Sequence, residues 1–523
     1  MADTIQQTET TGSLVTQWAL APTDGASLAV FRVVLGLTVA AYAVKALLLG
    51  EVRGIYVDAP HHFSYYGFSW VKPWPSGGMY LHFFALAMSG VLVAAGILYR
   101  VSSVLMAVLF TFVFLCDRTA YLNHMYLICL LSWMIVVVPA HAVWSMDRFG
   151  HTDKSPSTVP TWSVWLVRFH VALPYFFGGL AKLNSDWLHG QPMRMTLSQQ
   201  EWFGAVGQHG NPEWIVQIFS FGGIFFDLAI VPALLLARVR AIAFVVAMAF
   251  HFTNAFVFPI GVFPWLMIAA TSVFFASDWP RRAAARVGLR AAGIINTAPT
   301  ETCLEADTAT PSFRQNPGLS LLAAYVVFQC IVPLRHLALP GNVSWTERGH
   351  FFAWHMMLRG KRCGLRIYAT DRETGMTTPV DLRHFVTAYQ LPKVGRDPEH
   401  IRQLAHKIAT TLDPANPKRF EIRALALVSL NGRMAELLVD PSVNLAAMPA
   451  TWTHPKWILK SQQLLPKQHW NVPLLEWETA LGLNVEELLN VQTLPKDKAA
   501  KVSVPPGQKH VRIQKPQGPS IEG

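Results

Sequence analysis

The sequence predicts an all-α polytopic membrane domain of about nine transmembrane helices, followed by a smaller β-rich or mixed domain outside the membrane. Of the 523 residues, 52% are hydrophobic and 14% are charged, against about 25% charged in an ordinary soluble protein. The charge is also uneven, since residues 1–340 hold 35 of the Asp, Glu, Lys and Arg side chains and residues 341–523 hold the other 40. A membrane part therefore precedes a water-soluble part.

A transmembrane helix needs about 20 mostly apolar residues. Nine stretches are candidates: 25–49, 77–98, 102–116, 119–139, 162–182, 213–236, 239–257, 259–277 and 318–337. Arg and Lys gather on the cytoplasmic side of membrane proteins. With a cytoplasmic N-terminus, that side holds most of the basic loop residues, from Arg100 to the loop 278–317. An odd number of spans then places the soluble domain outside the cytoplasm.

These patterns divide the chain into four segments. Residues 1–22 are polar and lack the basic start of a cleaved signal peptide. Residues 23–339 form the transmembrane domain and residues 340–494 the extracytoplasmic domain. Residues 495–523, rich in Lys, Pro and Gly, form a flexible basic tail.

The soluble domain shows signals for strands, turns and one helix. Alternation of apolar and polar residues predicts strands in 364–370, 376–380 and 420–439, and residues 397–411 are helical in pattern. Glu373-Thr-Gly and Asn431-Gly432 are turn sequences.

The net charge of +11 raises the question of a nucleic-acid partner. Basic loops on the cytoplasmic side explain this charge, and no lysine block alternates with aromatic residues, so we expect no nucleic acid. The five cysteines form no CxxC pair, and no HxxxH or HExxH occurs. We therefore expect neither a disulfide framework nor a metal site.

Ionisable residues inside a span are costly and are candidates for function. Lys182 follows an apolar run and the pair Gly178-Gly179. One interpretation is a lysine that reaches the membrane interface. The other is a packed interior position, which the two glycines favour, where a desolvated lysine is a suitable general base.

Two further clusters are expected at the depth of Lys182, in the outer half of the membrane. Asn123 and His124 lie one turn into their span, and His251 and Asn254 lie three residues apart on one helical face. A single histidine in a span is commonly a packing residue. Several polar groups at one depth instead predict a shared pocket, which we expect to include Trp187.

Two other ionisable residues, Arg168 and Asp227, are expected nearer the middle of the membrane or its inner side. Asp227 needs a cationic or hydrogen-bonding partner, and Arg32 and Arg168 are the available cations. A structural ion pair is the favoured interpretation, with a place in the pocket as the alternative.

Several ordered blocks of this sequence resemble the vitamin K-dependent gamma-carboxylase family, whose membrane part is the HTTM domain. The most specific block is Gly179-Leu-Ala-Lys182-Leu-Asn-Ser-Asp186-Trp187-Leu-His-Gly190. The others are Ala26 to Arg32, Leu122 to Tyr126, Ala142 to Asp147, His251 to Asn254 continuing to Pro280, Pro333 to His336, and Trp345 to Met357. Animal members often carry two lysines where this chain has Ala181-Lys182. The polar N-terminus and the compact loops resemble a bacterial member more than an animal one.

The resemblance implies a carbon-carbon lyase that uses reduced vitamin K, O2 and CO2. Lys182 matches the family's base, which deprotonates the hydroquinone, and His124 matches a supporting catalytic residue. Oxygenated vitamin K then removes a γ-proton from a protein-bound glutamate, the carbanion captures CO2, and the quinone leaves as its 2,3-epoxide. The cofactor would be phylloquinol or menaquinol, without a metal.

The resemblance also implies partners and a location. The partners would be the lipid membrane, a glutamate-containing peptide or protein, and a quinone reductase that supplies hydroquinone. The expected location is a bacterial inner membrane, with the N-terminus cytoplasmic. The alternatives are a quinol epoxidase that does not carboxylate glutamate, and a transporter or lipid-binding protein on the same scaffold.

Overall fold

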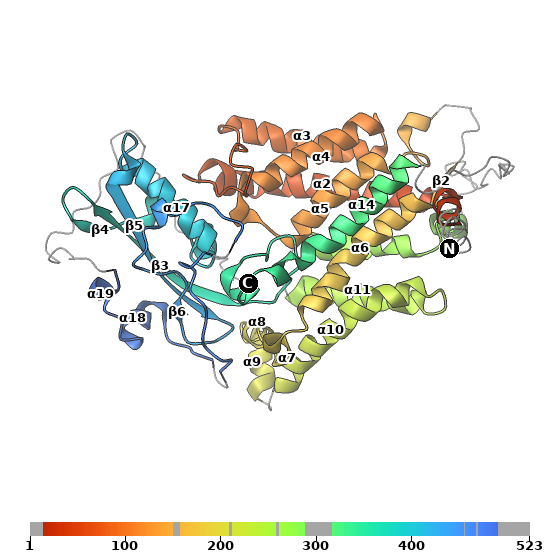
Figure 1. The fold of residues 1–523 in the computed structure, drawn as a ribbon. Coiled ribbons are helices and arrows are strands. Elements are labelled where there is room, and N and C mark those ends of the chain that lie inside the picture. Colours follow the sequence, from red (N-terminus) through yellow and green to blue (C-terminus); the bar gives the residue numbers. More distant parts are fainter. Residues whose placement is uncertain are drawn as a thin grey trace, which may run out of the picture.

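The structure is a computed structural model that describes residues 14–149, 157–208, 212–257, 261–287, 316–453, 455–466 and 469–489. Figure 1 shows a bundle of long helices joined at one end to a domain that contains a β-sheet. A small two-stranded sheet of β1 (Pro22–Asp24) and β2 (Thr158–Pro160) lies near the opposite end of the bundle.

Seven helices are long and apolar enough to cross a membrane, so the chain is a multi-pass membrane protein. They are α2 (Ala26–Leu48), α3 (Gly77–Ala95), α4 (Tyr99–Cys116), α6 (Thr161–Ala181), α10 (Glu213–Leu235), α11 (Arg240–Val257) and the continuous stretch Pro317–Ala338, in which α14 (Pro317–Ile331) passes into a 3-10 turn. Two shorter apolar helices, α5 (Asn123–Val137) and α12 (Phe263–Thr271), occupy the other two predicted spans. The predicted fold class is confirmed, with seven full-length spans in place of about nine.

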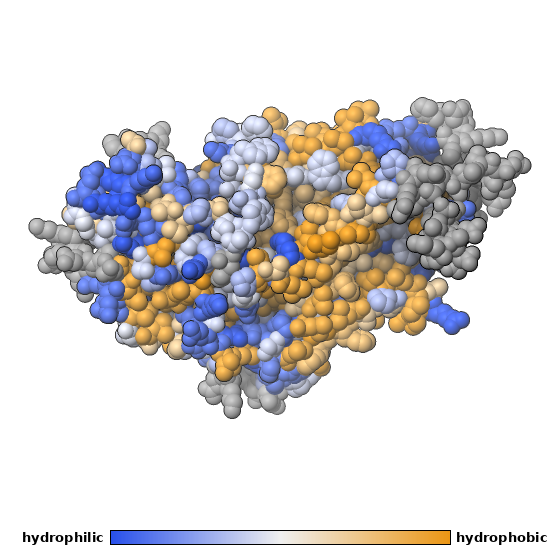
Figure 2. Space-filling model, in the orientation of Figure 1, coloured by the Kyte–Doolittle hydropathy of each residue, from blue (hydrophilic) through white to orange (hydrophobic). Residues whose placement is uncertain are grey.

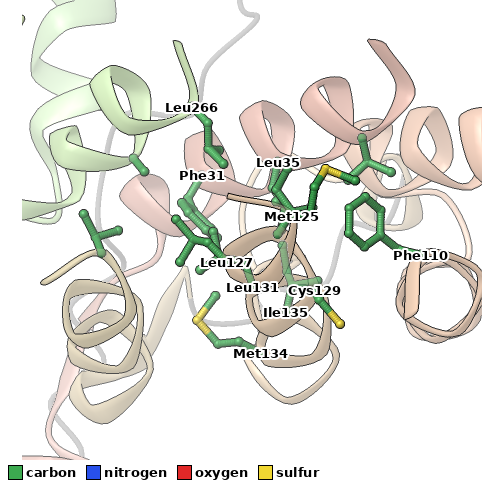
Figure 3. Close-up of a cluster of buried hydrophobic side chains, with 14 of the residues drawn as sticks. Phe31, Leu35, Phe110, Met125, Leu127, Cys129, Leu131, Met134, Ile135 and Leu266 are labelled. Carbon is green, nitrogen blue, oxygen red and sulfur yellow. The ribbon is translucent and has the colours of Figure 1, made fainter. Parts of the chain in front are cut away.

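One face of the shorter helix α5 packs against neighbouring helices of the bundle, as Figure 3 shows. Its side chains Leu127 and Leu131 are fully buried and pack in one cluster with Leu35 of α2 and Phe110 of α4. Residues before α5 form a 3-10 turn, Arg118–Ala120, because the buried carboxylate of Asp117 accepts a hydrogen bond from the Thr119 amide. This turn shortens the predicted span.

The surface follows the same division (Figure 2). Hydrophobic residues gather over the helical bundle and hydrophilic residues over the sheet domain. This distribution is the one expected when the bundle faces lipid and the sheet domain faces water. Which side of the membrane holds the sheet domain stays a prediction, as do the predicted segment boundaries.

The sheet domain contains a four-stranded antiparallel sheet in the order β4-β3-β5-β6. Its strands are β3 (Lys361–Asp371), β4 (Thr377–Pro379), β5 (Phe420–Leu430) and β6 (Glu436–Leu437), and β3 pairs with β5 along its whole length. Helix α17 (Pro398–Leu412) packs on this sheet through Ile401, Leu404 and Ile408, which are fully buried.

The strands and the helix predicted for this domain are confirmed, except that one predicted strand is divided into two. Predicted strand 420–439 is two strands, because Asn431 and Gly432 both adopt positive φ angles, 52° and 81°, and end β5. The basic tail, 495–523, lies outside the described residues. Short helices complete the fold: α7 (Ser185–Leu188), α8 (Met193–Leu197), α9 (Glu201–Gln208), α13 (Trp279–Arg286), α15 (Val343–Thr346), α16 (Leu391–Val394), α18 (Trp477–Ala480) and α19 (Val485–Leu489).

Buried ion pairs join the bundle to the sheet domain. Arg433 donates two hydrogen bonds to Asp186, of 2.6 and 2.7 Å, and Asn431 donates a third of 2.8 Å. Burial alone would raise the pKa of Asp186, but hydrogen bonds from Arg433 and Asn431 hold it below the usual value. A second pair, Arg118 with Asp397 at 2.9 Å, links the turn before α5 to α17.

We expect Arg433→Met to destabilise the protein, because it leaves the Asp186 carboxylate buried without its cation. Breaking a buried pair costs about 3–5 kcal/mol, which should lower the thermal unfolding midpoint in detergent by roughly 5 °C or more. The matched control is Arg383→Met. Arg383 pairs with Asp381 but its side chain is 79% exposed, so its loss should change stability by less than about 1 kcal/mol. Equal midpoints for the two variants would contradict the role given to this pair.

Candidate active site

A cavity of about 420 Å³ lies where the helical bundle meets the sheet domain. This volume is within the range of roughly 300–1,000 Å³ that small-molecule sites occupy. One end is lined by residues of α5, α6, α10, α11 and α12, and the other by charged residues between Glu347 and His400. The cavity therefore has a membrane end and a polar end.

Lys182 and Asp227 form an ion pair in the wall of the membrane end. The Lys182 Nζ donates a hydrogen bond to Asp227 Oδ2. Lys182 is 6% exposed and Asp227 is 4% exposed, so each charge depends on the other for compensation. Trp187 covers the pair, with the Lys182 Nζ 5.2 Å from the centre of its ring and the indole N–H bonded to the Ser220 carbonyl at 2.8 Å.

Two glycines make this pair possible. A Cβ atom on Gly179 would lie 2.8 Å from Leu228 Cδ2 and 3.0 Å from Asp227 Cβ, and one on Gly178 would lie 2.8 Å from Met356 Cε. At position 179, glycine therefore lets α6 approach α10 this closely, whereas Gly178 leaves room for the end of the Met356 side chain. Because Lys182 follows α6 directly, this approach brings its amine to the Asp227 carboxylate.

The predicted polar residues of α5 also reach the cavity. Asn123 donates a hydrogen bond of 3.2 Å to the His355 carbonyl and accepts one of 3.0 Å from the Tyr121 hydroxyl. His124 lines the membrane end, with its ring centre 5.8 Å from that of Phe263. Within the described ranges His124 has no side-chain hydrogen-bond partner, so its ring nitrogens are free to contact a ligand.

The predicted pair on α11 lies in the same wall. His251 Nε2 lies 2.6 Å from the Tyr175 hydroxyl. Its Nδ1 is buried and has no hydrogen-bond partner among the described residues. Asn254, three residues further along, lines the same cavity. The structure thus brings together seven of the eight predicted site residues: Lys182, His124, Asn123, Trp187, His251, Asn254 and Asp227.

Two expectations about the arginines are wrong. Arg168 does not line the cavity, because its guanidinium donates to the carbonyls of Val273 and Phe275, each at 3.0 Å. Asp227 pairs with neither Arg168 nor Arg32. The Arg32 guanidinium bonds to the carbonyls of Ala140 and Trp144 at 3.0 and 2.6 Å. Both arginines satisfy backbone carbonyls.

The polar end consists of residues that the sequence reasoning did not assign. Glu347 accepts hydrogen bonds from Arg359 at 2.7 Å and Lys361 at 2.6 Å. Arg359 also contacts His350 Nε2 at 2.5 Å. A signal was available for part of this group, since the block Trp345 to Met357 matches the family without carrying any role. No sequence pattern predicted that the remaining residues of this wall, from Lys393 to His400, would line the cavity.

Burial and neighbouring charges shift the titration of this polar end. Burial lowers the pKa of Lys361 to about 8, against the effect of Glu347. Burial would raise the pKa of Glu347, but Arg359 and Lys361 hold it below the usual value. Burial and the Arg359 charge keep the pKa of His350 well below its usual range. At pH 7 the carboxylate is therefore charged and the imidazole neutral.

A second cavity, of about 390 Å³, lies beside the residues that precede and follow Lys182 in the chain. Its wall includes Leu180 and Leu183, beside the end of α6, and Leu334 and Leu337 of the turn Val332–Ala338. His355 and Leu358 line both cavities. The two spaces are therefore neighbours, separated by these side chains.

Comparison with protein families agrees with this arrangement. The HTTM domain family matches residues 20–279, and the lumenal domain of the vitamin K-dependent gamma-carboxylase matches residues 314–464. The chain belongs to the vitamin K-dependent gamma-carboxylase family. No solved structure matches the chain. The first match covers Lys182, His124 and the other predicted site residues, and the second covers the polar end of the cavity.

We expect Gly179→Ala to destabilise the protein, because the added methyl group would lie 2.8–3.0 Å from Leu228 and the Asp227 Cβ. Overpacking of this kind costs about 1–3 kcal/mol. Gly222→Ala in α10 is the control, since a Cβ there meets nothing within 4 Å and alanine favours a helix by about 1 kcal/mol. Thermal unfolding in detergent should therefore move in opposite directions for the two variants. A Gly179→Ala variant as stable as the parent protein would contradict the close approach of α6 and α10.

Proposed function

We propose that this chain is a membrane enzyme that oxygenates a reduced naphthoquinone to its 2,3-epoxide and couples that reaction to carboxylation of protein-bound glutamate. The observation that carries the proposal is the Lys182–Asp227 pair, buried in the wall of a cavity that opens onto both an apolar and a charged surface. Family membership supplies the reaction class, and the cavity supplies a place for it.

The membrane end has the chemistry to hold a naphthoquinol. Phe219, Phe250, Phe263 and Met267 provide apolar walls, while His124, Asn123 and Lys182 can meet the ring hydroxyls. A bound quinol supplies, on reaction with O2, the strong base that takes the γ-proton of glutamate. The residues of the chain have three tasks: to orient the ring, exclude water and accept the first proton.

Lys182 is the proposed proton acceptor. In a site poor in water, the charged pair of ammonium and carboxylate competes with the neutral pair of amine and carboxylic acid. Either form can take up one proton, and both then become an ammonium beside a carboxylic acid. The pair can thus act as a general base even though the Lys182 amine is bonded to the Asp227 carboxylate.

The other predicted site residues are proposed to orient the quinol and protect the reaction. His124 and the unpartnered Nδ1 of His251 can contact ring oxygens, and Asn254 lies beside them. Trp187 covers the Lys182–Asp227 pair and keeps water from it. Exclusion of water matters because a strong base formed in the site would otherwise take a proton from water.

The second cavity supports entry of the quinol from the bilayer. Its leucines Leu334 and Leu337 are 37% and 74% exposed, and lie on the helix that continues from α14. An isoprenoid chain could lie there while the ring occupies the main cavity. We propose menaquinol or phylloquinol as cofactor, with O2 and CO2 as co-substrates and a quinone reductase as supplier.

The expected location is the inner membrane of a bacterium, with the sheet domain outside the cytoplasm. That domain faces the polar end of the cavity, so a glutamate-containing peptide or protein would arrive from the same side. The family's second domain is described as lumenal, which supports this side.

We expect Lys182→Ala to abolish both products. Purified protein would be supplied with vitamin K hydroquinone or menaquinol, O2, labelled bicarbonate and a short glutamate peptide. The assay measures quinone epoxide and acid-stable label in the peptide. Loss of a general base lowers the rate by about 10²–10⁴-fold, so both products should fall below detection.

Lys45→Ala is the control for this experiment, since Lys45 is half exposed and pairs with Glu51 outside the cavity. Epoxide without labelled peptide in the parent protein would indicate a quinol epoxidase that does not carboxylate this substrate. Full activity of Lys182→Ala would contradict its role as base. No product with either quinol would favour a transporter or lipid-binding protein.

We expect Asp227→Asn to lower kcat for epoxide formation by about 10²-fold or more, because the pair loses its second proton acceptor. The KM for the quinol should change by less than about threefold, since Asn keeps the shape of the side chain. Asp227→Glu retains the carboxylate and should keep more activity than Asp227→Asn. A change confined to KM would show that Asp227 contributes to binding only.

A further inference from the structure

The polar end of the cavity carries more positive than negative charge. Four cationic side chains line it, and two carboxylates oppose them: Arg118, Arg359, Lys393 and Arg396 against Glu347 and Asp397. The histidines do not change this balance, because burial keeps the pKa of His350 well below its usual range and lowers that of His355 to about 3. An anion is therefore the ligand that this end of the cavity favours.

Two of the four cations are already compensated. Arg118 pairs with Asp397 at 2.9 Å, and Arg359 pairs with Glu347 at 2.7 Å. Lys361, just behind, binds the same oxygen of Glu347 at 2.6 Å. Both carboxylates are thus occupied by other cations, and neither is left to pair with Lys393 or Arg396.

Lys393 and Arg396 have no carboxylate within ion-pair distance in the described part of the chain. The Lys393 Nζ lies 3.3 Å from the centre of the Tyr389 ring, which positions it. Burial and the neighbouring Arg396 lower the pKa of Lys393 to about 7, although Asp117 partly opposes them. Burial and Arg359 lower the pKa of Arg396, although Glu347 and Asp397 partly oppose them. These shifts have the direction expected when positive charge is desolvated without enough compensation.

Other polar atoms around this end are also buried without partners. Among the described residues they are the donors Arg118 Nη1 and His350 Nδ1, the acceptors Glu347 Oε2 and His400 Nε2, and His355 Nδ1. Unsatisfied buried polar atoms are uncommon in folded proteins and call for an explanation. A peptide ligand would supply carbonyl and carboxylate acceptors for the donors and N–H groups for the acceptors.

We propose that Lys393 and Arg396 form the subsite for the side-chain carboxylate of the substrate glutamate and so determine specificity for glutamate over glutamine. This inference rests on the proposed function. The carboxylate would lie at the polar end and the quinol ring at the membrane end. The γ-carbon, next to the carboxylate, would then face the membrane end, where its proton is removed.

Bicarbonate carries the same chemical group and is the competing source of a carboxylate. We assign the subsite to glutamate for two reasons. CO2, the form that a carbanion attacks, is neutral and needs no cations. In addition, the unpartnered polar atoms, both donors and acceptors, extend over several side chains, which fits a ligand larger than bicarbonate.

The test is a binding measurement that requires no turnover. The probe is a short fluorescent peptide with one internal glutamate, and its partner peptide has glutamine in that position. Fluorescence anisotropy with the full chain in detergent gives both dissociation constants. We expect the glutamate peptide to bind the parent protein about 10- to 100-fold more tightly, the range of a charge-assisted hydrogen-bond pair.

Arg396→Gln and Lys393→Gln should each weaken glutamate-peptide binding by about tenfold or more and leave glutamine-peptide binding unchanged. Arg396→Lys keeps the charge and should retain more of the preference than Arg396→Gln. Arg366→Gln is the control, because Arg366 lies on β3 with a 55% exposed side chain. Unchanged binding of the glutamine peptide shows that a variant is folded.

Two kinds of outcome would overturn the subsite. One is equal affinity of the parent protein for the two peptides, or a glutamate preference that survives both Gln variants. The other is displacement of the peptide by bicarbonate at concentrations near the peptide's own dissociation constant, which would assign the cations to bicarbonate. Neither outcome depends on epoxide formation, so this inference can fail while the proposed reaction stands, and the reverse also holds.

Discussion

The rest of the site depends on one interaction, the ion pair between Lys182 and Asp227. A lysine and an aspartate that are both almost fully buried would each be costly alone, and together they are tolerable only in direct contact. Contact requires α6 and α10 to approach closely, which Gly179 allows because a side chain there would meet Leu228 and Asp227 of α10. Trp187 then seals the pair. The motif that contains Lys182 therefore allows the two helices to pack closely and also supplies reactive groups.

The second constraint is that neither domain forms the cavity alone. The helical bundle provides the Lys182–Asp227 pair and the apolar walls, and the segments after the last span provide most of the charged end, with Arg118 of the turn before α5. Asp186, four residues after Lys182, binds Arg433 of the sheet domain. One short segment therefore carries both the proposed base and a residue that attaches the bundle to the sheet domain. In addition, Asn123 contacts the His355 carbonyl directly. A shift between the domains would therefore disturb both ends of the cavity together.

The sequence predicted the helices, the strands and the clustering of the polar residues well, because hydropathy, alternation and turn residues are local signals. Lys182, His124 and His251 could be placed at one level of the bundle from their positions in their spans. The partner of Asp227 could not, because pairing depends on how each helix is rotated about its axis. Arg168 was misplaced for the same reason, since its side chain turns toward the Val273 carbonyl. The polar end was missed because Arg118, Arg359 and Arg396 come from segments far apart in the chain.

The central claim is that a reduced naphthoquinone binds with a ring hydroxyl against Lys182. The most direct measurement is an experimental structure of the protein with a stable naphthol analogue of the quinol. Our account predicts the aromatic ring in the membrane end of the cavity, with its hydroxyl within hydrogen-bond distance of the Lys182 Nζ and its substituent directed toward Leu358 and the second cavity. A ring bound elsewhere, with the Lys182–Asp227 pair out of its reach, would contradict the account.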